Sequence, residues 1–222
     1  MTEKRIRIIP AYAAAPLLCL CLMHAAVWLG TKAVADYSRA WDVTLAIDAL
    51  IPLRPEWVVI YSATFLFWIM GLYVISLQDE ERCCRFVAGV IFAELICCFI
   101  FIAFPSCITR PEIEPDGVFT WALSIVYALD TPTNCFPSMH CLLSWLVLRQ
   151  ALRSPRARPG YKLFCGVFTA LVCLSTLFVK QHVVADVFGG LLFGELAFVL
   201  GQKLPLWKFF IKINKKVLHF FS

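Results

Sequence analysis

The amino-acid sequence predicts an all-α membrane protein, a polytopic helical bundle with six transmembrane helices. Of its 222 residues, 61% are hydrophobic and only 16% are charged. Soluble domains average roughly 45–50% apolar and about 25% charged residues. The apolar residues are also gathered in runs close to the length of about 20 residues with which a helix crosses a bilayer. These two observations exclude a water-soluble fold and indicate that the helices lie in the lipid bilayer.

Six apolar segments have the length and composition of transmembrane helices. We expect the spans at Ala11 to Gly30, Trp57 to Leu77, Phe86 to Phe104, Ser138 to Leu152, Leu163 to Val179 and Val183 to Leu204. The apolar stretch from Leu163 to Leu204 is too long for one crossing, so we expect a tight turn at Lys180 and Gln181 to divide it. No repeat or long linker separates the spans, so residues 1–222 are expected to form a single membrane domain.

The positive charges predict how the bundle is oriented. Fifteen of the 20 Lys and Arg residues lie in the amino-terminal segment, the 78–85 loop, the 149–162 stretch and the tail from Lys203. The opposite side carries the other five, which are Lys32, Arg39, Arg54, Arg110 and Lys180. Because loops rich in Lys and Arg stay in the cytoplasm, we expect a multi-pass protein of the cell (inner or plasma) membrane with both termini cytoplasmic.

The first apolar run has a second interpretation, a cleaved signal peptide. Basic residues precede it, and Ala33-Val34-Ala35 resembles a small-residue cleavage site. Its length favours a retained span, because the apolar core of a signal peptide has roughly 7–15 residues. Cleavage would leave the other spans in the same orientation, so the two interpretations predict the same outward side.

The loop over residues 105–137 is the longest on the outward side. It contains Cys107 and Cys135, which could form a disulfide or remain two free thiols, and the sequence does not decide between these alternatives. It also contains an apolar piece from Phe119 to Leu129 that is too short to span. This piece is expected to be a loop helix, with an interfacial or site-covering helix as the alternatives.

The tail over residues 205–222 mixes aromatic side chains with four lysines, a composition that suits an anionic membrane surface. We therefore interpret the net charge of +5 as a sign of contact with the bilayer, and no nucleic-acid partner is predicted.

Two histidines mark the outward edge of the predicted bundle, where ionisable groups are costly and are functional candidates. His140 opens the fourth span and His182 opens the sixth. Pro137 suits the first turn of a helix. The amides of Ser138, Met139 and His140 would then be unpaired at the helix amino terminus, which is a natural cradle for phosphate.

The four-residue spacing of His182 and Asp186 places them on one helical face, where the carboxylate orients the imidazole. The other ring nitrogen is then free to attack phosphorus or to take a proton. Two acids, Glu94 and Glu195, lie inside spans, and we expect them to pair with each other, with lipid binding or a pathway lining as alternatives. His24 has no acidic neighbour at helical spacing and is interpreted as a packing or pore residue.

The combined pattern resembles the type 2 phosphatidic acid phosphatase (PAP2) superfamily. Its parts are Arg110-Pro111, Pro137-Ser138-Met139-His140, Ser175-Thr176, His182 and Asp186. The resemblance implies that His182 forms a phosphohistidine, that Asp186 orients it and that His140 protonates the leaving oxygen, without a metal or other cofactor. It also implies a PAP2-like catalytic core at 86–204, after a two-helix part at 1–85 and before the basic amphipathic cytoplasmic tail. The phosphate-binding candidates are Arg110, Lys180, Ser138, Met139, Ser175 and Thr176.

Two basic positions of the family's motifs are replaced here, by Ala103 and Thr176. Lys180 is the residue that we expect to compensate, since a lysine ammonium is a compact charge on a flexible stem. The losses resemble the branch of sphingomyelin synthases and inositol phosphorylceramide synthases.

The expected activity is therefore hydrolysis of a phosphate ester of a membrane phospholipid or polyprenyl (pyro)phosphate on the extracytoplasmic face. The alternative is transfer of a lipid headgroup to a hydroxylated acceptor. A third possibility is a transporter or scaffold without catalysis.

Overall fold

The computed structural model describes the backbone of residues 9–220 and the side chains of residues 9–216. Within that part, eight α-helices run from α1 (Ala11–Val34), α2 (Val58–Ser76), α3 (Glu80–Ala103) and α4 (Val118–Leu129) to α5 (Met139–Arg153), α6 (Pro159–Phe178), α7 (Val184–Lys203) and α8 (Leu206–Phe220). Two short strands, β1 (Trp41–Asp42) and β2 (Ser106–Cys107), pair in parallel. Short 3-10 helices at Tyr37–Arg39, Ala46–Leu50 and Pro55–Trp57 lie between α1 and α2.

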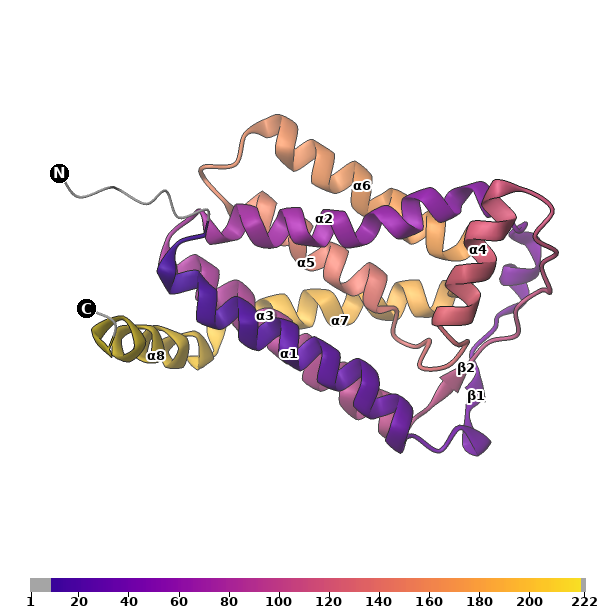
Figure 1. Ribbon diagram of the computed structural model, residues 1–222, viewed down its shortest axis with the longest axis horizontal. Coiled ribbons are helices and arrows are strands. Elements are labelled where there is room, and N and C mark those ends of the chain that lie inside the picture. The colour runs from indigo at the N-terminus through magenta and orange to yellow at the C-terminus, as the bar shows by residue number, and fades with distance from the viewer. Residues whose placement is uncertain (1–8, 221–222) are drawn as a thin grey trace.

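Helices α1, α2, α3, α5, α6 and α7 extend between the two ends of the molecule (Figure 1), and their bounds overlap the predicted spans. Helix α8 and the start of α1 lie at one end, and β1, β2 and α4 lie at the other. In the described chain, five helices are long and apolar enough to cross a membrane, namely α1, α2, α3, α6 and α7. The fourth predicted span is the 15-residue α5, which is too short to join them. The chain is thus an all-α, multi-pass membrane protein.

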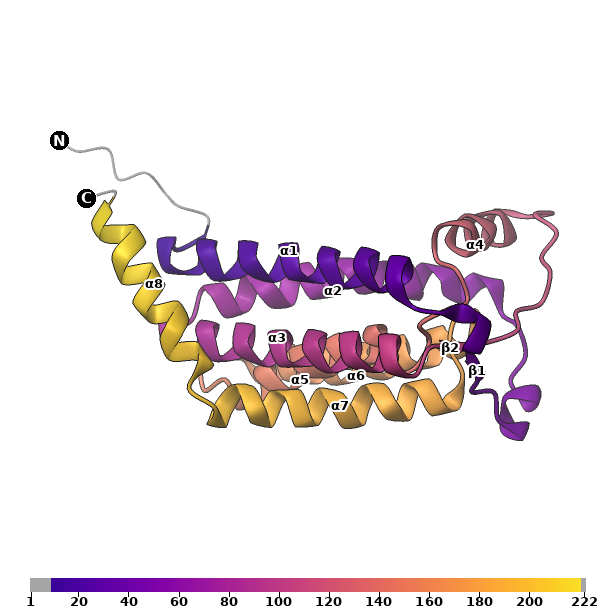
Figure 2. The same cartoon turned by 90° about the horizontal axis from the view of Figure 1, so that it is seen from below.

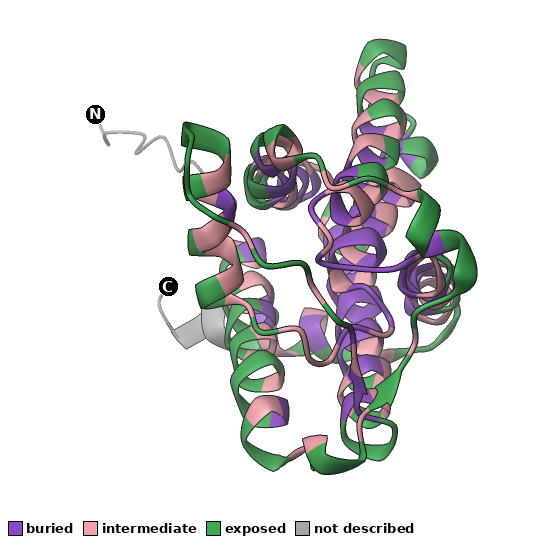
Figure 3. Ribbon diagram, turned by 90° about the vertical axis from the view of Figure 1, so that its right-hand side faces the viewer, coloured by how far each residue is buried: buried purple, intermediate pink, exposed green. Residues whose placement is uncertain are grey.

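The helices pack around α3, α5 and α7. Helix α7 contacts both α3 and α5, while α1 lies on α3 and α6 lies on α5. Figure 2 shows α1 and α2 on one side and α7 on the opposite side, with α3 between them. Buried residues gather on the central helices when the molecule is viewed from the β1–β2 end (Figure 3). Outward-facing leucines and phenylalanines are largely exposed, for example Leu66, Leu163 and Phe188. Exposed apolar area on this scale is typical of a surface that faces lipid.

Glycines let α7 approach its neighbours closely. A Cβ on Gly201 would lie 2.5 Å from the Cα of Gly89 in α3, and one on Gly190 would lie 2.6 Å from the Ser138 carbonyl oxygen. Small residues at such contacts are a common feature of helix packing in membranes, where close van der Waals contact drives association. The close approach at Gly190 brings the start of α7 against the start of α5, where the candidate residues lie.

The prediction that Glu94 and Glu195 pair with each other is wrong. Glu94 Oε1 lies 2.6 Å from His24 Nδ1, and Glu195 Oε2 lies 2.7 Å from the Nε of Arg149. The two glutamates face different helices, α1 for the first and α5 for the second. His24 is consequently a hydrogen-bond partner of Glu94, and its interpretation as a packing or pore residue missed an acid 70 positions away.

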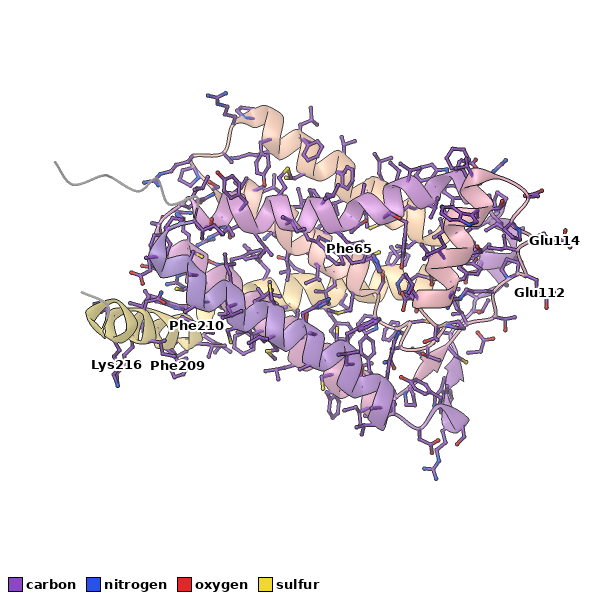
Figure 4. The ribbon with its side chains drawn as sticks, in the orientation of Figure 1. Phe65, Glu112, Glu114, Phe209, Phe210 and Lys216 are labelled. Atoms are coloured by element: carbon purple, nitrogen blue, oxygen red, sulfur yellow. The ribbon has the colours of Figure 1, made fainter. Side chains whose placement is uncertain are left out.

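The tail forms α8, whose inner face packs on α3 and α1. Phe210 and Asn214 are buried, and the Asn214 amide donates to Glu80 Oε1 at 3.0 Å. Phe209 and Lys216 are exposed on the same helix (Figure 4). An amphipathic helix with basic and aromatic exposed side chains is suited to lie in the membrane interface.

All eleven cysteines, each within the described residues, are free thiols, so the disulfide considered between Cys107 and Cys135 is not formed. The two side chains have different surroundings. Cys135 is buried with Ile108 and Val183, whereas Cys107 lies half-buried in β2 with its Sγ 4.0 Å from the Ala40 carbonyl.

Candidate active site

His182 lies in the turn between α6 and α7, and Asp186 lies in the first turn of α7. The Asp186 Oδ2 accepts hydrogen bonds from the Val183 amide at 3.0 Å and from His182 Nδ1 at 3.1 Å. One carboxylate therefore caps the helix and orients the imidazole, which is fully consistent with the preference for acids at a helix amino terminus. The predicted pair forms, although His182 precedes the helix instead of opening it.

His140 lies in the first turn of α5 and faces His182, with the two ring centroids 5.7 Å apart. Its ring packs against Tyr61 at 4.4 Å and Trp68 at 5.4 Å between centroids. Both ring nitrogens are buried, and neither has a hydrogen-bond partner among the described residues. Buried polar atoms in native proteins are rarely left unpaired, so this imidazole is placed to meet a ligand.

Ser138 is the N-cap of α5, and its hydroxyl accepts a hydrogen bond from the Cys141 amide at 3.4 Å. The prediction of a free Ser138 amide is wrong, because that amide donates to the main-chain carbonyl of Asp186 at 3.0 Å. Pro137 also precedes the cap and does not occupy the first helical turn. Ser138 thus joins the segments that carry the two histidines, while Met139, one residue on, lines the cavities beside them.

Two cavities meet at His140. A small one of about 70 Å³ lies between the histidines and is also lined by Gln181, Asn134 and Lys32. A larger apolar one of about 510 Å³ extends between α1, α2, α3 and α5. Five residues line both cavities, namely Trp28, Phe101, Asp130, Met139 and His140. A small chamber lined by both histidines and Lys32 continues into an apolar one, which matches a substrate with a polar head and a hydrocarbon tail.

Lys32 is a candidate that the sequence analysis did not identify. It lies in the last turn of α1, lines the small cavity, and its Nζ is 3.3 Å from Asp130 Oδ1. The predicted compensating cation, Lys180, is not among the cavity-lining residues, and its Nζ donates to the carbonyls of Asp48, at 3.0 Å, and Ile51. The structure therefore brings Lys32, and not Lys180, to the histidine pair.

Arg110 lies beside the small cavity and reaches it through Asp130. Its Nη2 donates to the Asp130 carbonyl, and its guanidinium lies 4.5 Å from the centre of the Tyr127 ring. Burial lowers the pKa of Arg110, but a guanidinium stays protonated in proteins. Burial raises the pKa of Tyr127 to about 12, so its phenol remains neutral. Arg110 also lines a surface cavity of about 350 Å³ near Glu112 (Figure 4).

Ser175 and Thr176 are fully buried, and their hydroxyls donate to carbonyls one turn earlier in α6, both at 2.8 Å. The Thr176 carbonyl accepts from the amides of Gln181 and His182 at 3.0 and 3.1 Å. These contacts support the turn that carries His182. Phosphate binding by the two hydroxyls stays a prediction.

Asp48 is a second residue that the sequence analysis did not place in the site. Its carboxylate is buried and accepts hydrogen bonds at 2.8 Å from the amides of Val184 and Leu45. Its main-chain carbonyl accepts a hydrogen bond from Lys180 Nζ. The backbone of Lys180 has a positive φ of 54°, which is unfavourable for a residue other than glycine. The 46–50 segment therefore fixes the turn from outside. Among the described residues, no group of three or more His, Cys, Asp or Glu side chains is suited to hold a metal ion.

Two comparisons of the sequence with known proteins found a match. A family model described as the PAP2 superfamily matches residues 84–209, which is more than half of the chain and includes both histidines. The chain is also 37% identical over 78 residues to sphingosine-1-phosphate phosphatase 2 from Homo sapiens, which covers 33% of this chain and 19% of that protein. The matched stretch is thus about a fifth of the relative's length. No solved structure matches the chain.

Proposed function

The chain belongs to the PAP2 superfamily, and from that premise we propose that it is a membrane phosphatase that hydrolyses a phosphate ester of a phospholipid or polyprenyl (pyro)phosphate. The observation that carries the proposal is the histidine pair. His140, with both ring nitrogens unpartnered among the described residues, lies 5.7 Å from the ring of His182, whose Nδ1 is held by Asp186. The name of the human relative, a phosphatase, supports the same reaction class.

The reaction that we propose has two steps. In the first, His182 Nε2 attacks phosphorus, the bond from phosphorus to the lipid oxygen breaks, and His140 gives that oxygen its proton. In the second, a water molecule attacks the phosphohistidine, His140 takes the water's proton, and phosphate leaves. Asp186 keeps the His182 proton on Nδ1 and stabilises the positive ring that forms, as an acid does in a catalytic triad.

Positive groups stabilise the phosphoryl group, which carries most of the charge during transfer. We assign this role to Lys32 and Arg110. Lys32 contacts the carboxylate of Asp130, and Arg110 donates to the main-chain carbonyl of the same residue, which lines the cavity. Lys32 supplies, from α1, a cation that the motif positions Ala103 and Thr176 no longer carry. Lys180 instead supports the turn before His182.

We also propose six crossings, with both termini cytoplasmic and the histidines extracytoplasmic in the cell membrane. The distribution of Lys and Arg supports this orientation. So does the position of α8 and the start of α1 at the end opposite β1, β2 and α4 (Figure 1). Helix α5 can complete the count despite its 15 residues, since protein surrounds it and irregular backbone is tolerated where protein covers it.

The test is a product analysis with protein purified in detergent. It is incubated in ¹⁸O-labelled water with phosphatidic acid, phosphatidylglycerol phosphate, polyprenyl pyrophosphate or sphingosine 1-phosphate, with and without a hydroxylated lipid acceptor. Hydrolysis predicts free phosphate that contains one ¹⁸O atom. His182→Asn should abolish it, and the control Glu195→Gln should not. A new phosphorylated lipid without free phosphate would establish the transferase alternative, and no product from folded protein would favour a non-catalytic role.

A further inference from the structure

The larger cavity is apolar over most of its surface. It has a volume of about 510 Å³ and is lined by aromatic side chains that include Trp28, Phe65, Trp68 and Phe101. Ligand pockets commonly have volumes of roughly 300–1,000 Å³. Phe65 (Figure 4) is about half-exposed at this cavity. If the phosphate of a lipid lies between the two histidines, its hydrocarbon chain can occupy this larger cavity.

Glu94 interrupts that apolar lining. Its side chain is 1% exposed, and its Oε1 lies 2.6 Å from His24 Nδ1. Its Oε2 is buried and has no hydrogen-bond partner among the described residues. A buried ionisable group at membrane depth is costly, and leaving an acceptor unpaired adds the cost of its desolvation. Pairing with His24 satisfies only one of the two oxygens, and Glu94 is one of the residues that line the cavity.

The pair is close to the proposed reaction centre. The Trp68 ring lies 6.5 Å from the His24 ring and 5.4 Å from the His140 ring. One aromatic side chain thus separates the two histidines, and all three line the cavity. The lining contains two carboxylates, Glu94 and Asp130, and neither lysine nor arginine. Because Asp130 is already paired with Lys32, the carboxylate oxygen left without a partner is Glu94 Oε2, and it favours a ligand that donates a hydrogen bond.

We propose that Glu94, positioned by His24, recognises a hydrogen-bond donor on the hydrocarbon chain of the substrate. This donor is a hydroxyl or an amine close to the phosphate. This inference rests on the proposed function and narrows its substrate class. A hydroxyl or ammonium group satisfies Oε2 when the chain enters, whereas an unsubstituted alkyl chain leaves that oxygen unpaired. The enzyme then discriminates between lipids of equal length, because a site built around a buried acceptor rejects analogues that lack the donor.

The test compares three phosphates with similar chains. Sphinganine 1-phosphate carries an amine and a hydroxyl, 3-deoxysphinganine 1-phosphate keeps the amine but lacks the hydroxyl, and octadecyl phosphate has neither. We expect kcat/KM for sphinganine 1-phosphate to exceed that for octadecyl phosphate by at least about tenfold, the effect of one hydrogen bond to a charged group. Retained preference for the 3-deoxy compound identifies the amine as the donor, and its loss identifies the hydroxyl.

Glu94→Gln is expected to lower this preference by about tenfold and to change octadecyl phosphate turnover little, because only the donor-bearing lipids lose a contact. Glu195→Gln, another glutamate within a helix, is the matched control and should keep the preference. A purely structural role for Glu94 predicts equal losses on all three lipids, which would overturn the proposal.

Equal turnover of the three lipids by the unmodified protein would also overturn it, without any need for a folded variant. Binding of the same lipids to His182→Asn gives the affinity ratio without catalysis. The selectivity is therefore measurable even if the proposed hydrolysis fails, and the two failures are distinguishable.

Discussion

The main-chain carbonyl of Asp186 accepts a hydrogen bond from the amide of Ser138 at 3.0 Å. This bond joins the first turn of α7 to the N-cap of α5. Asp186 orients His182 with its side chain, and Ser138 caps the helix on which His140 lies. The 5.7 Å between the two rings is therefore set by a backbone contact as well as by the packing of side chains.

Asp186→Asn is expected to lower kcat by about 10³–10⁴-fold, the size of effect seen when the orienting acid of a triad becomes an amide. The asparagine oxygen can still accept from the Val183 amide, so the melting temperature should change little. The measurement is steady-state phosphate release together with thermal unfolding. Asp36→Asn, at an exposed loop position, is the control, and comparable activity of the two variants would contradict the orienting role.

Gly190→Ala is expected to destabilise the protein by about 1–3 kcal/mol, as overpacking does, and to lower activity. The added methyl would lie 2.6 Å from the Ser138 carbonyl and 2.9 Å from the Cys141 Cβ, so α5 and α7 must separate at the histidines. Gly160→Ala is the matched control, since its Cβ would meet nothing within 4 Å. Thermal unfolding in detergent checks both, and equal melting temperatures would refute the close-packing argument.

Lys32→Ala and Lys180→Ala should fail in different ways. Lys32→Ala is expected to lower kcat/KM by about 10²–10³-fold, as the loss of one group that stabilises transition-state charge does, with little change in stability. Lys180→Ala removes the ammonium group that donates hydrogen bonds to two main-chain carbonyls, so its main effect should be a lower melting temperature. A larger catalytic loss in Lys180→Ala at unchanged stability would show that Lys180 is the phosphate-binding cation.

Cys107 provides a test of orientation. Burial raises the pKa of its thiol, so less of the reactive thiolate is present at pH 7. As the pH is raised toward that pKa, the rate of maleimide labelling should increase about tenfold per pH unit. A membrane-impermeant maleimide should label Cys107 in intact cells, as peptide mapping by mass spectrometry can show. Labelling that requires permeabilised cells would place this end of the bundle on the cytoplasmic side.

Local spacing was sufficient for part of the site. The four-residue interval between His182 and Asp186 predicted their contact, and the apolar runs predicted where the long helices lie. The helix boundaries were less certain, since α5 has only 15 residues and His182 precedes α7. Capping contacts, such as those made by the Ser138 hydroxyl and the Asp186 carboxylate, decide those boundaries.

Contacts between distant residues were not predictable from the pattern. His24 and Glu94 are 70 positions apart, Lys32 and Asp130 are 98 apart, and Asp48 and Val184 are 136 apart. Each contact depends on which helices become neighbours, and helical periodicity specifies only which face a residue occupies. Lys32 was not predicted for this reason, because only the packing of the helices brings the carboxyl end of α1 beside the histidines.

The most direct test of the proposed mechanism is a rapid-quench measurement of the phosphoenzyme. Protein is mixed with ³²P-labelled lipid phosphate, quenched in alkali within one turnover, and digested for peptide analysis. The mechanism predicts an acid-labile, alkali-stable phosphate on the peptide that contains His182, and its absence in His182→Asn. Turnover without any labelled peptide, retained in His182→Asn, would contradict it.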